Sequence, residues 1–186
     1  MAVEKNLNFG IIGNCRSAAL INEKGSIDWC CLPKFDSPSI FAKILDQEKG
    51  GGFWIETKNK FNITQEYLGD SCILKTIFEN EEQAFELIDF MPRFQTEDGQ
   101  YYAPPELIRF VNPIKGNAQI QLQYDPRLEY AQGKTTHKIK QNAIVSEVET
   151  PTHDSLFLYT NTEKKSVLNK EYFSLNSPLF FNLSYN

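Results

Sequence analysis

Residues 10–41 read GIIGNCRSAALINEKGSIDWCCLPKFDSPSIF, and this segment is the most informative about the fold class. Short apolar segments such as residues 17–21 alternate with turns, and residues 22–25 (NEKG) are typical of a hairpin loop. Residues 26–32 (SIDWCCL) predict the returning strand, which Pro33 ends because proline has no N–H to donate. The stretch therefore predicts antiparallel strands joined by tight turns.

The end of the same stretch predicts a loop and then a short helix. Residues 35–39 (FDSPS) have the composition of a turn, in which Asp36 can accept hydrogen bonds from the following backbone. Either Ser37 or Ser39 can cap a helix over residues 40–45.

Most of the remaining chain alternates between apolar and polar residues, as strands do. The clearest case is AQIQLQY, in which Ala118, Ile120, Leu122 and Tyr124 share one face and three glutamines share the other. Further strands are predicted at residues 53–56, 62–68, 72–79, 84–91, 106–111, 135–140, 143–149, 156–160, 167–175 and 179–185. The sequence thus predicts an all-β fold, an antiparallel β-sandwich with about eleven to thirteen strands and one short helix.

Composition narrows the class of protein. The chain has 186 residues, a net charge of −5 and 41% hydrophobic residues, which fits one soluble domain with a sizeable core. Lysine and arginine are scattered, which argues against a nucleic-acid surface, and no apolar run approaches the ~20 residues of a membrane span. The first ten residues contain no apolar signal segment, so we expect a cytoplasmic protein. Four cysteines without a CxxC pair and two histidines predict no metal or other cofactor.

Three carboxylates invite a catalytic interpretation because glycosidases work with paired acids. Asp28, Asp36 and Asp89 each sit beside an aromatic residue, whose apolar surface can raise the pKa of a carboxyl. The structural alternative places Asp28 and Asp89 on a polar strand face and Asp36 in a turn, and we favour it for each of the three.

Arginine and histidine offer further candidates. Arg16 precedes a small apolar strand, where a buried charge requires a partner, so we expect an ion pair with Asp28 or Asp36. The sharper alternative is a guanidinium that contacts a sugar or an anion. The segment 153–155 (HDS) contains the residue types of a catalytic triad, but such triads are assembled in space, and we interpret this one as a surface loop. We expect His137 to be solvated.

A series of motifs carries a family resemblance. They are GIIGNCRSAALI (10–21), GSIDW (25–29), LPKFDSPSIF (32–41), LD (45–46), GG (50–51), YL (67–68), ILKT (73–76), DFMP (89–92), LIR (107–109) and DPR (125–127) with Tyr130. In this order they resemble the opening of bacterial proteins of glycoside hydrolase family 15, the glucoamylase-like and trehalase-like enzymes. The resemblance covers residues 8–130 well and the remainder loosely.

The resemblance implies a fold and a separation between a non-catalytic and a catalytic domain. Members of the family carry an N-terminal antiparallel β-sandwich of the super-sandwich type, then a linker and an (α/α)6 catalytic barrel with both catalytic glutamates. The twelve helices of a barrel do not fit beside a dozen strands, so we expect residues 1–186 to be one N-terminal domain, truncated before the linker. No residue here matches the catalytic motifs, so none is assigned as catalytic and the chain alone is expected to be inactive.

The expected function follows from that separation. The full-length protein resembles an inverting hydrolase of an α-glucan or trehalose, and this domain packs on its barrel. The loop residues expected to face the barrel or the substrate are Asn14, Arg16, Ser17, Phe35, Asp36, Ser37 and Pro38. Without the barrel, the exposed barrel-facing surface offers a route to a dimer. The alternative is a stand-alone carbohydrate-binding or protein-interaction sandwich, which an exposed row of aromatic residues would favour.

Overall fold

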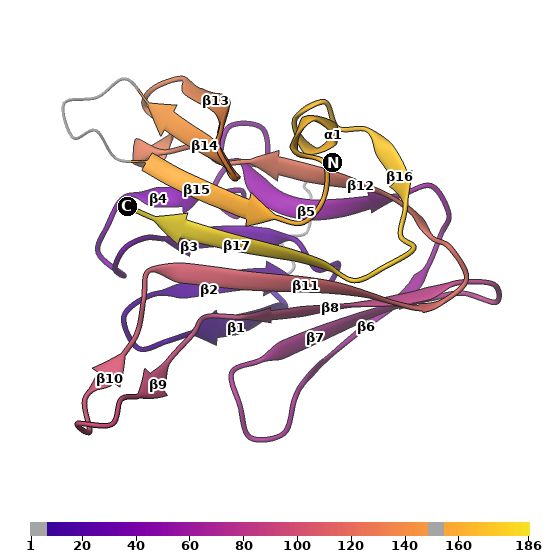
Figure 1. Cartoon of the computed structure of the whole chain (residues 1–186), viewed down its shortest axis with the longest axis horizontal. Helices are drawn as coiled ribbons and strands as arrows, with labels where there is room; N and C mark the ends of the chain where they lie inside the picture. Colours follow the sequence, from indigo (N-terminus) through magenta and orange to yellow (C-terminus); the bar gives the residue numbers. More distant parts are fainter. Residues whose placement is uncertain (1–6, 149–154) are drawn as a thin grey trace.

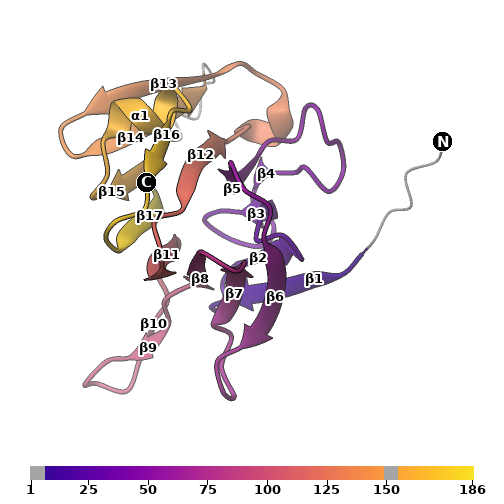
Figure 2. The same cartoon turned by 90° about the vertical axis from the view of Figure 1, so that its right-hand side faces the viewer.

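The structure is a computed structural model that describes residues 7–148 and 155–186, and it consists of two antiparallel sheets packed face to face (Figures 1 and 2). The first sheet contains β1 (Phe9–Gly13), β2 (Ala18–Asn22), β3 (Ile27–Cys31), β4 (Ser39–Phe41), β5 (Gly52–Thr57), β12 (Gln119–Asp125) and β16 (Tyr172–Ser174). The second contains, in spatial order, β13 (Thr135–Lys140), β14 (Ala143–Val148), β15 (Ser155–Thr160), β17 (Leu179–Tyr185), β11 (Glu106–Lys115), β8 (Ala84–Phe90), β7 (Leu74–Glu79) and β6 (Asn62–Tyr67). The all-β antiparallel prediction is confirmed.

Smaller elements complete the described chain. A ribbon of β9 (Phe94–Gln95) and β10 (Tyr101–Tyr102) projects from one end of the sandwich (Figure 1). A 3₁₀ turn, η1 (Glu129–Ala131), and one short helix, α1 (Lys164–Leu168), lie between strands. The described residues thus contain seventeen strands, slightly above the predicted range, because β4, β9, β10 and β16 are only two or three residues long. No helix in these parts of the chain is long and apolar enough to cross a membrane.

The predicted position of the helix is wrong. Residues 39–41 form β4 instead, which pairs with β3, and all three residues are buried, which an amphipathic surface helix does not allow. The helix α1 replaces the first part of the strand predicted at residues 167–175, and only β16 remains of that strand. Val167 is the one buried residue of α1. The prediction interpreted this apolar residue as part of a strand alternation.

The hairpin at the start of the chain is confirmed. β2 and β3 pair antiparallel, and Gly25 has a φ of +75° in the loop between them. The Asn22 carbonyl accepts the Gly25 N–H at 2.9 Å, and the Asn22 Oδ1 accepts the N–H groups of Lys24 and Ser26. Asn22 therefore organises this loop with both its backbone and its side chain.

The core lies between the two sheets. Phe53 of the first sheet meets Phe181 of the second edge to face, with ring centroids 5.6 Å apart. The four apolar residues of the predicted AQIQLQY strand are buried as expected, although Gln123 is buried as well.

Candidate functional site

Two loops from residues 10–41 meet at one end of the sandwich. The turn between β1 and β2 lies beside the loop between β3 and β4, because the Phe35 N–H donates to the Arg16 carbonyl at 3.1 Å. The buried hydroxyl of Ser17 donates to the Cys31 carbonyl. The structure thus brings together the two sets of predicted loop residues, which lie about twenty positions apart in the chain.

Asn14 holds this end of the molecule together. It is only 1% exposed, and its Oδ1 accepts the N–H groups of Arg16 and Ser17 at 3.1 and 3.0 Å. Its Nδ2 donates to the carbonyls of Pro92 at 3.3 Å and Pro104 at 2.9 Å. Pro92 precedes β9 and Pro104 follows β10, so this one side chain fixes the β1–β2 turn against the base of the ribbon.

The ribbon presents aromatic rings to solvent. Phe94, Tyr101 and Tyr102 are all more than half exposed, and the Arg93 guanidinium lies 4.0 Å from the Tyr101 ring centroid. An open pocket of about 420 Å³ lies beside the base of the ribbon, with Cys72, Arg93 and Phe94 in its lining. The sequence analysis missed this element because its strands are two residues long and carry no alternation.

Two expectations about the loops are corrected. Arg16 is exposed and forms no ion pair within the described parts of the chain, so it needs neither Asp28 nor Asp36 as a partner. The loop after β3 is closed by Ser37, whose hydroxyl accepts the Lys34 N–H at 3.1 Å, and Asp36 is exposed.

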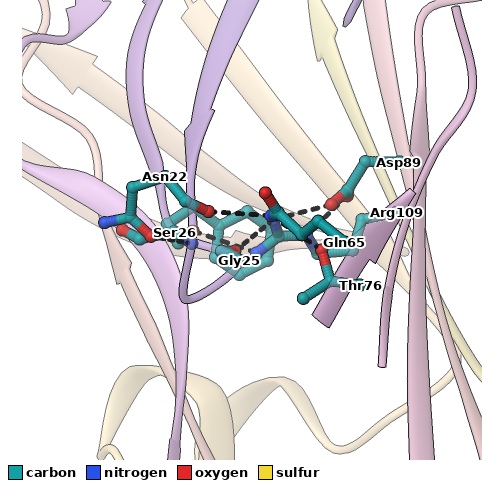
Figure 3. Close-up of polar contacts among 8 residues, drawn as sticks. Asn22, Gly25, Ser26, Gln65, Thr76, Asp89 and Arg109 are labelled. Carbon is teal, nitrogen blue, oxygen red and sulfur yellow. Dashed lines mark hydrogen bonds and ion pairs between the residues drawn. The ribbon is translucent and has the colours of Figure 1, made fainter. Parts of the chain in front are cut away.

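The buried arginine of this fold is Arg109, and its partner is Asp89 (Figure 3). Both side chains are 0% exposed, and the guanidinium grips the carboxylate with two hydrogen bonds, Nε to Oδ1 at 2.7 Å and Nη2 to Oδ2 at 3.0 Å. Asp89 therefore does not lie on a polar strand face. Burial raises the pKa of the Asp89 carboxyl, and the guanidinium opposes that rise.

Arg109 also joins the two sheets. Its Nη1 donates to the Phe53 carbonyl at 2.9 Å and its Nη2 to the Gly25 carbonyl at 2.8 Å, and both acceptors belong to the first sheet or its hairpin loop. Beside it, Gln65 of β6 donates to the Asn22 carbonyl at 2.8 Å (Figure 3). Both carboxylate oxygens of Asp89 therefore accept hydrogen bonds from Arg109, and the pair has a structural role.

Asp28 has a structural role as well. It is buried rather than placed on a polar face, and it accepts hydrogen bonds from the Asn22 amide at 2.8 Å and from the Ser26 hydroxyl. Asp28 and Asp89 thus accept hydrogen bonds from different side chains of the domain, and Asp36 lies in an exposed loop. The three carboxylates do not assemble into an acid–base pair.

Of the two histidine candidates, His137 lies within the described residues and His153 does not. His137 is half-buried rather than solvated, and its Nδ1 lies 2.9 Å from the Ser146 hydroxyl, which also contacts the Tyr124 hydroxyl at 3.0 Å. Burial lowers the pKa of His137. His153 and Asp154 lie outside the described residues, and Ser155 begins β15. Across residues 7–148 and 155–186, no three His, Cys, Asp or Glu side chains gather as metal ligands do.

Comparison with known proteins gives one consistent answer. The family described as "Trehalase-like, N-terminal" matches residues 4–162. Trehalase 2 of Sulfolobus acidocaldarius is 48% identical over 87 residues, which cover 46% of this chain and 14% of that protein. The trehalase of Thermoplasma volcanium is 35% identical over 141 residues, or 73% of this chain and 22% of that protein. In both relatives the match spans less than a quarter of their length. No solved structure matches significantly.

Proposed function

Because the chain belongs to the family of trehalase-like N-terminal domains, we propose that it is the non-catalytic N-terminal domain of a trehalase-like glycoside hydrolase of family 15. The full-length protein hydrolyses an α-glucosidic bond, with trehalose as the first substrate to test and maltooligosaccharides as the second. The family match over residues 4–162 carries this proposal.

The state of the carboxylates supports a non-catalytic role for this domain. Inverting hydrolysis needs a general acid and a general base on opposite sides of the bond, about 6.5–9.5 Å apart, with a water between them. Asp28 and Asp89 are buried and already accept hydrogen bonds from side chains of the same domain. Asp36 is exposed in a loop. The catalytic pair belongs to the (α/α)6 domain that the family resemblance implies.

The loops at the ribbon end give the domain its contribution to the site. Asn14 fixes the β1–β2 turn to the base of the ribbon, so Arg16, Phe35 and the ribbon rings are exposed at the same end of the sandwich. We place this end, with Asp36, Ser37 and Pro38 on the adjoining loop, at the mouth of the catalytic site. Rigid loops at the mouth can exclude water and select substrate by shape.

Hydrolysis assays test the proposal directly. Release of glucose from trehalose and from maltooligosaccharides is measured for the 186-residue chain and for the full-length product of its gene. Activity in the longer protein alone supports the proposal and identifies the substrate. Turnover by the 186-residue chain would overturn it and return attention to Asp28, Asp36 and Asp89.

The exposed ribbon favours one second candidate, a carbohydrate-binding role for the domain itself. Aromatic rings stack on sugar faces, and the pocket beside the ribbon is within the size range of small-molecule sites. Calorimetric titration of the isolated chain with trehalose and maltotriose tests it. Binding that the Tyr101→Ala substitution abolishes supports this role, and heat no larger than dilution for both sugars rejects it.

We also propose that the protein works in the cytoplasm. All four cysteines are unpaired, and Cys30 and Cys31 are buried in β3. Free thiols persist in reducing compartments. Burial raises the pKa of the Cys31 thiol, which keeps it in the unreactive protonated form.

A further inference from the structure

The outer face of the second sheet is apolar, although antiparallel sheets with one solvated face normally place polar residues there. On β11 the inward residues Leu107, Arg109 and Val111 are buried, as the core requires. The outward residues between them, Ile108 and Phe110, are also apolar. A strand that is apolar on both sides is typical of a sheet covered on both faces.

Strand register extends this apolar surface across four strands. Phe110 lies directly opposite Phe180 of β17 and Ile88 of β8. In the next row, Ile108 lies between Asn182 of β17 and Phe90 of β8. We call this surface the outer apolar face, and it consists of Ile88, Phe90, Ile108, Phe110, Phe157, Tyr159 and Phe180 around Asn182.

Four aromatic rings of this face stack in two pairs. Phe90 and Phe110 stack with centroids 6.4 Å apart and an interplanar angle of 13°. Phe157 and Tyr159 of β15 stack at 6.3 Å with the same angle. Polar pairs lie at the margins, since Asn112 donates to Glu86 on one side and Lys75 pairs with Glu66 on the other. An apolar centre with a polar margin is the usual anatomy of a protein interface.

We propose that the outer apolar face is the surface on which the rest of the trehalase-like enzyme docks. The inference rests on the proposed function and deepens it by naming the docking surface. The docking partner is apolar where it covers Phe110 and Phe180, which are 37% and 38% exposed.

Two observations favour the rest of the enzyme as the occupant. The matched segments of the relatives make up only 14% to 22% of their length in the two cases above, so most of each relative lies beyond the domain. The face is also continuous with the proposed site, because the ribbon leaves from β8 and returns into β11, two of its four strands. A partner seated on this face therefore reaches the loops that Asn14 organises.

Hydroxyl-radical footprinting tests which surface is covered. Tyr159 and Tyr172 are matched probes, since they are 39% and 40% exposed and only Tyr159 belongs to the face. We expect the oxidation of Tyr159, Phe110 and Phe180 to fall several-fold in the full-length protein relative to the isolated chain, while the oxidation of Tyr172 stays constant. Equal oxidation of Tyr159 in both proteins would overturn the proposal.

The outcomes separate this inference from the proposed function. Protection of Tyr159 in a full-length protein that hydrolyses neither trehalose nor maltooligosaccharides would leave the docking surface standing and reject the activity. Hydrolysis by a full-length protein with an unprotected Tyr159 would do the reverse. Protection that appears in the isolated chain as its concentration rises, together with a dimer in sedimentation, would assign the face to a second copy and overturn the choice of occupant.

Discussion

The buried pair of Arg109 and Asp89 allows a quantitative test of how the two sheets are held together. Replacing Asp89 with Asn leaves the buried guanidinium uncompensated, and breaking a buried pair in this way costs about 3–5 kcal/mol. Replacing Arg109 with Met leaves a buried carboxylate and removes the donor to the carbonyls of Gly25 and Phe53. The double variant contains no buried charge, and its remaining cost comes from the two carbonyls and from the buried Asn amide at position 89, about 1–3 kcal/mol each. We therefore expect the two single losses to exceed the loss in the double variant by at least about 2 kcal/mol.

The pH dependence gives a second, independent readout. In the Arg109→Met variant, burial still raises the pKa of Asp89 and no guanidinium opposes the rise. A carboxyl whose folded pKa lies above its unfolded value binds more protons in the folded state, so stability increases as the pH falls between these two values. The gain approaches about 1.4 kcal/mol per pH unit in that window. The Arg109→Met/Asp89→Asn variant lacks this carboxyl and should not show the gain.

Urea unfolding at pH 7 and pH 5, followed by tryptophan fluorescence, measures both effects. Arg109→Lys serves as a milder variant, because it keeps the charge but loses the two-pronged contact with the carboxylate. Single losses that add within about 0.5 kcal/mol would refute the coupling. An Arg109→Met variant that is no more stable relative to the double variant at pH 5 than at pH 7 would refute the role of burial.

Three further predictions concern single side chains. Asn14→Ala should speed amide exchange in the β9–β10 ribbon and lower the free energy of unfolding by about 1–3 kcal/mol. The control Asn14→Asp keeps the acceptor and loses the donor, so it should speed exchange in the ribbon but preserve the β1–β2 turn. Gly25→Ala should cost about 1–3 kcal/mol in urea unfolding, because φ is +75° and a Cβ would lie 2.9 Å from Leu87, whereas Gly69→Ala, with φ +55° and no atom within 4 Å, should cost less. Burial lowers the pKa of His137, so the folded state binds fewer protons than the unfolded state and stability falls as the pH drops below about 6.5. The His137→Gln variant should therefore lose less stability than the wild type in urea unfolding between pH 7 and pH 5.

The sequence predicted those parts of the fold that depend on local pattern. The β2–β3 hairpin follows from the NEKG loop, and most other strands follow from the two-residue alternation. The helix was misplaced because the segment after Ser39 is apolar on every side, and periodicity over three residues cannot separate a strand from a helix. The ribbon could not be predicted from alternation because a two-residue strand has none.

The site depended on contacts between distant segments. The sequence analysis placed Asn14 and Phe35 in loops, but the hydrogen bonds from Asn14 to Pro92 and Pro104 cross 78 and 90 positions. No pattern within one segment records such a contact. The predicted placement of these loops against a catalytic domain stays a prediction.

Arg16 was predicted to be the buried arginine, although the sequence around Arg109 indicates burial more strongly. Arg16 was chosen because it stands next to apolar residues, but a turn residue can point outward whatever its neighbours are. Arg109 stands between Leu107 and Val111 in a strand, and the two-residue period puts all three side chains on the same face. A charge that shares the face of core residues is expected to be buried, and a buried arginine needs acceptors for its hydrogen bonds, of which a carboxylate also balances the charge. Asp89 occupies the register position opposite Arg109 on β8, so alternation together with pairing of the DFM and LIR segments would have identified both partners.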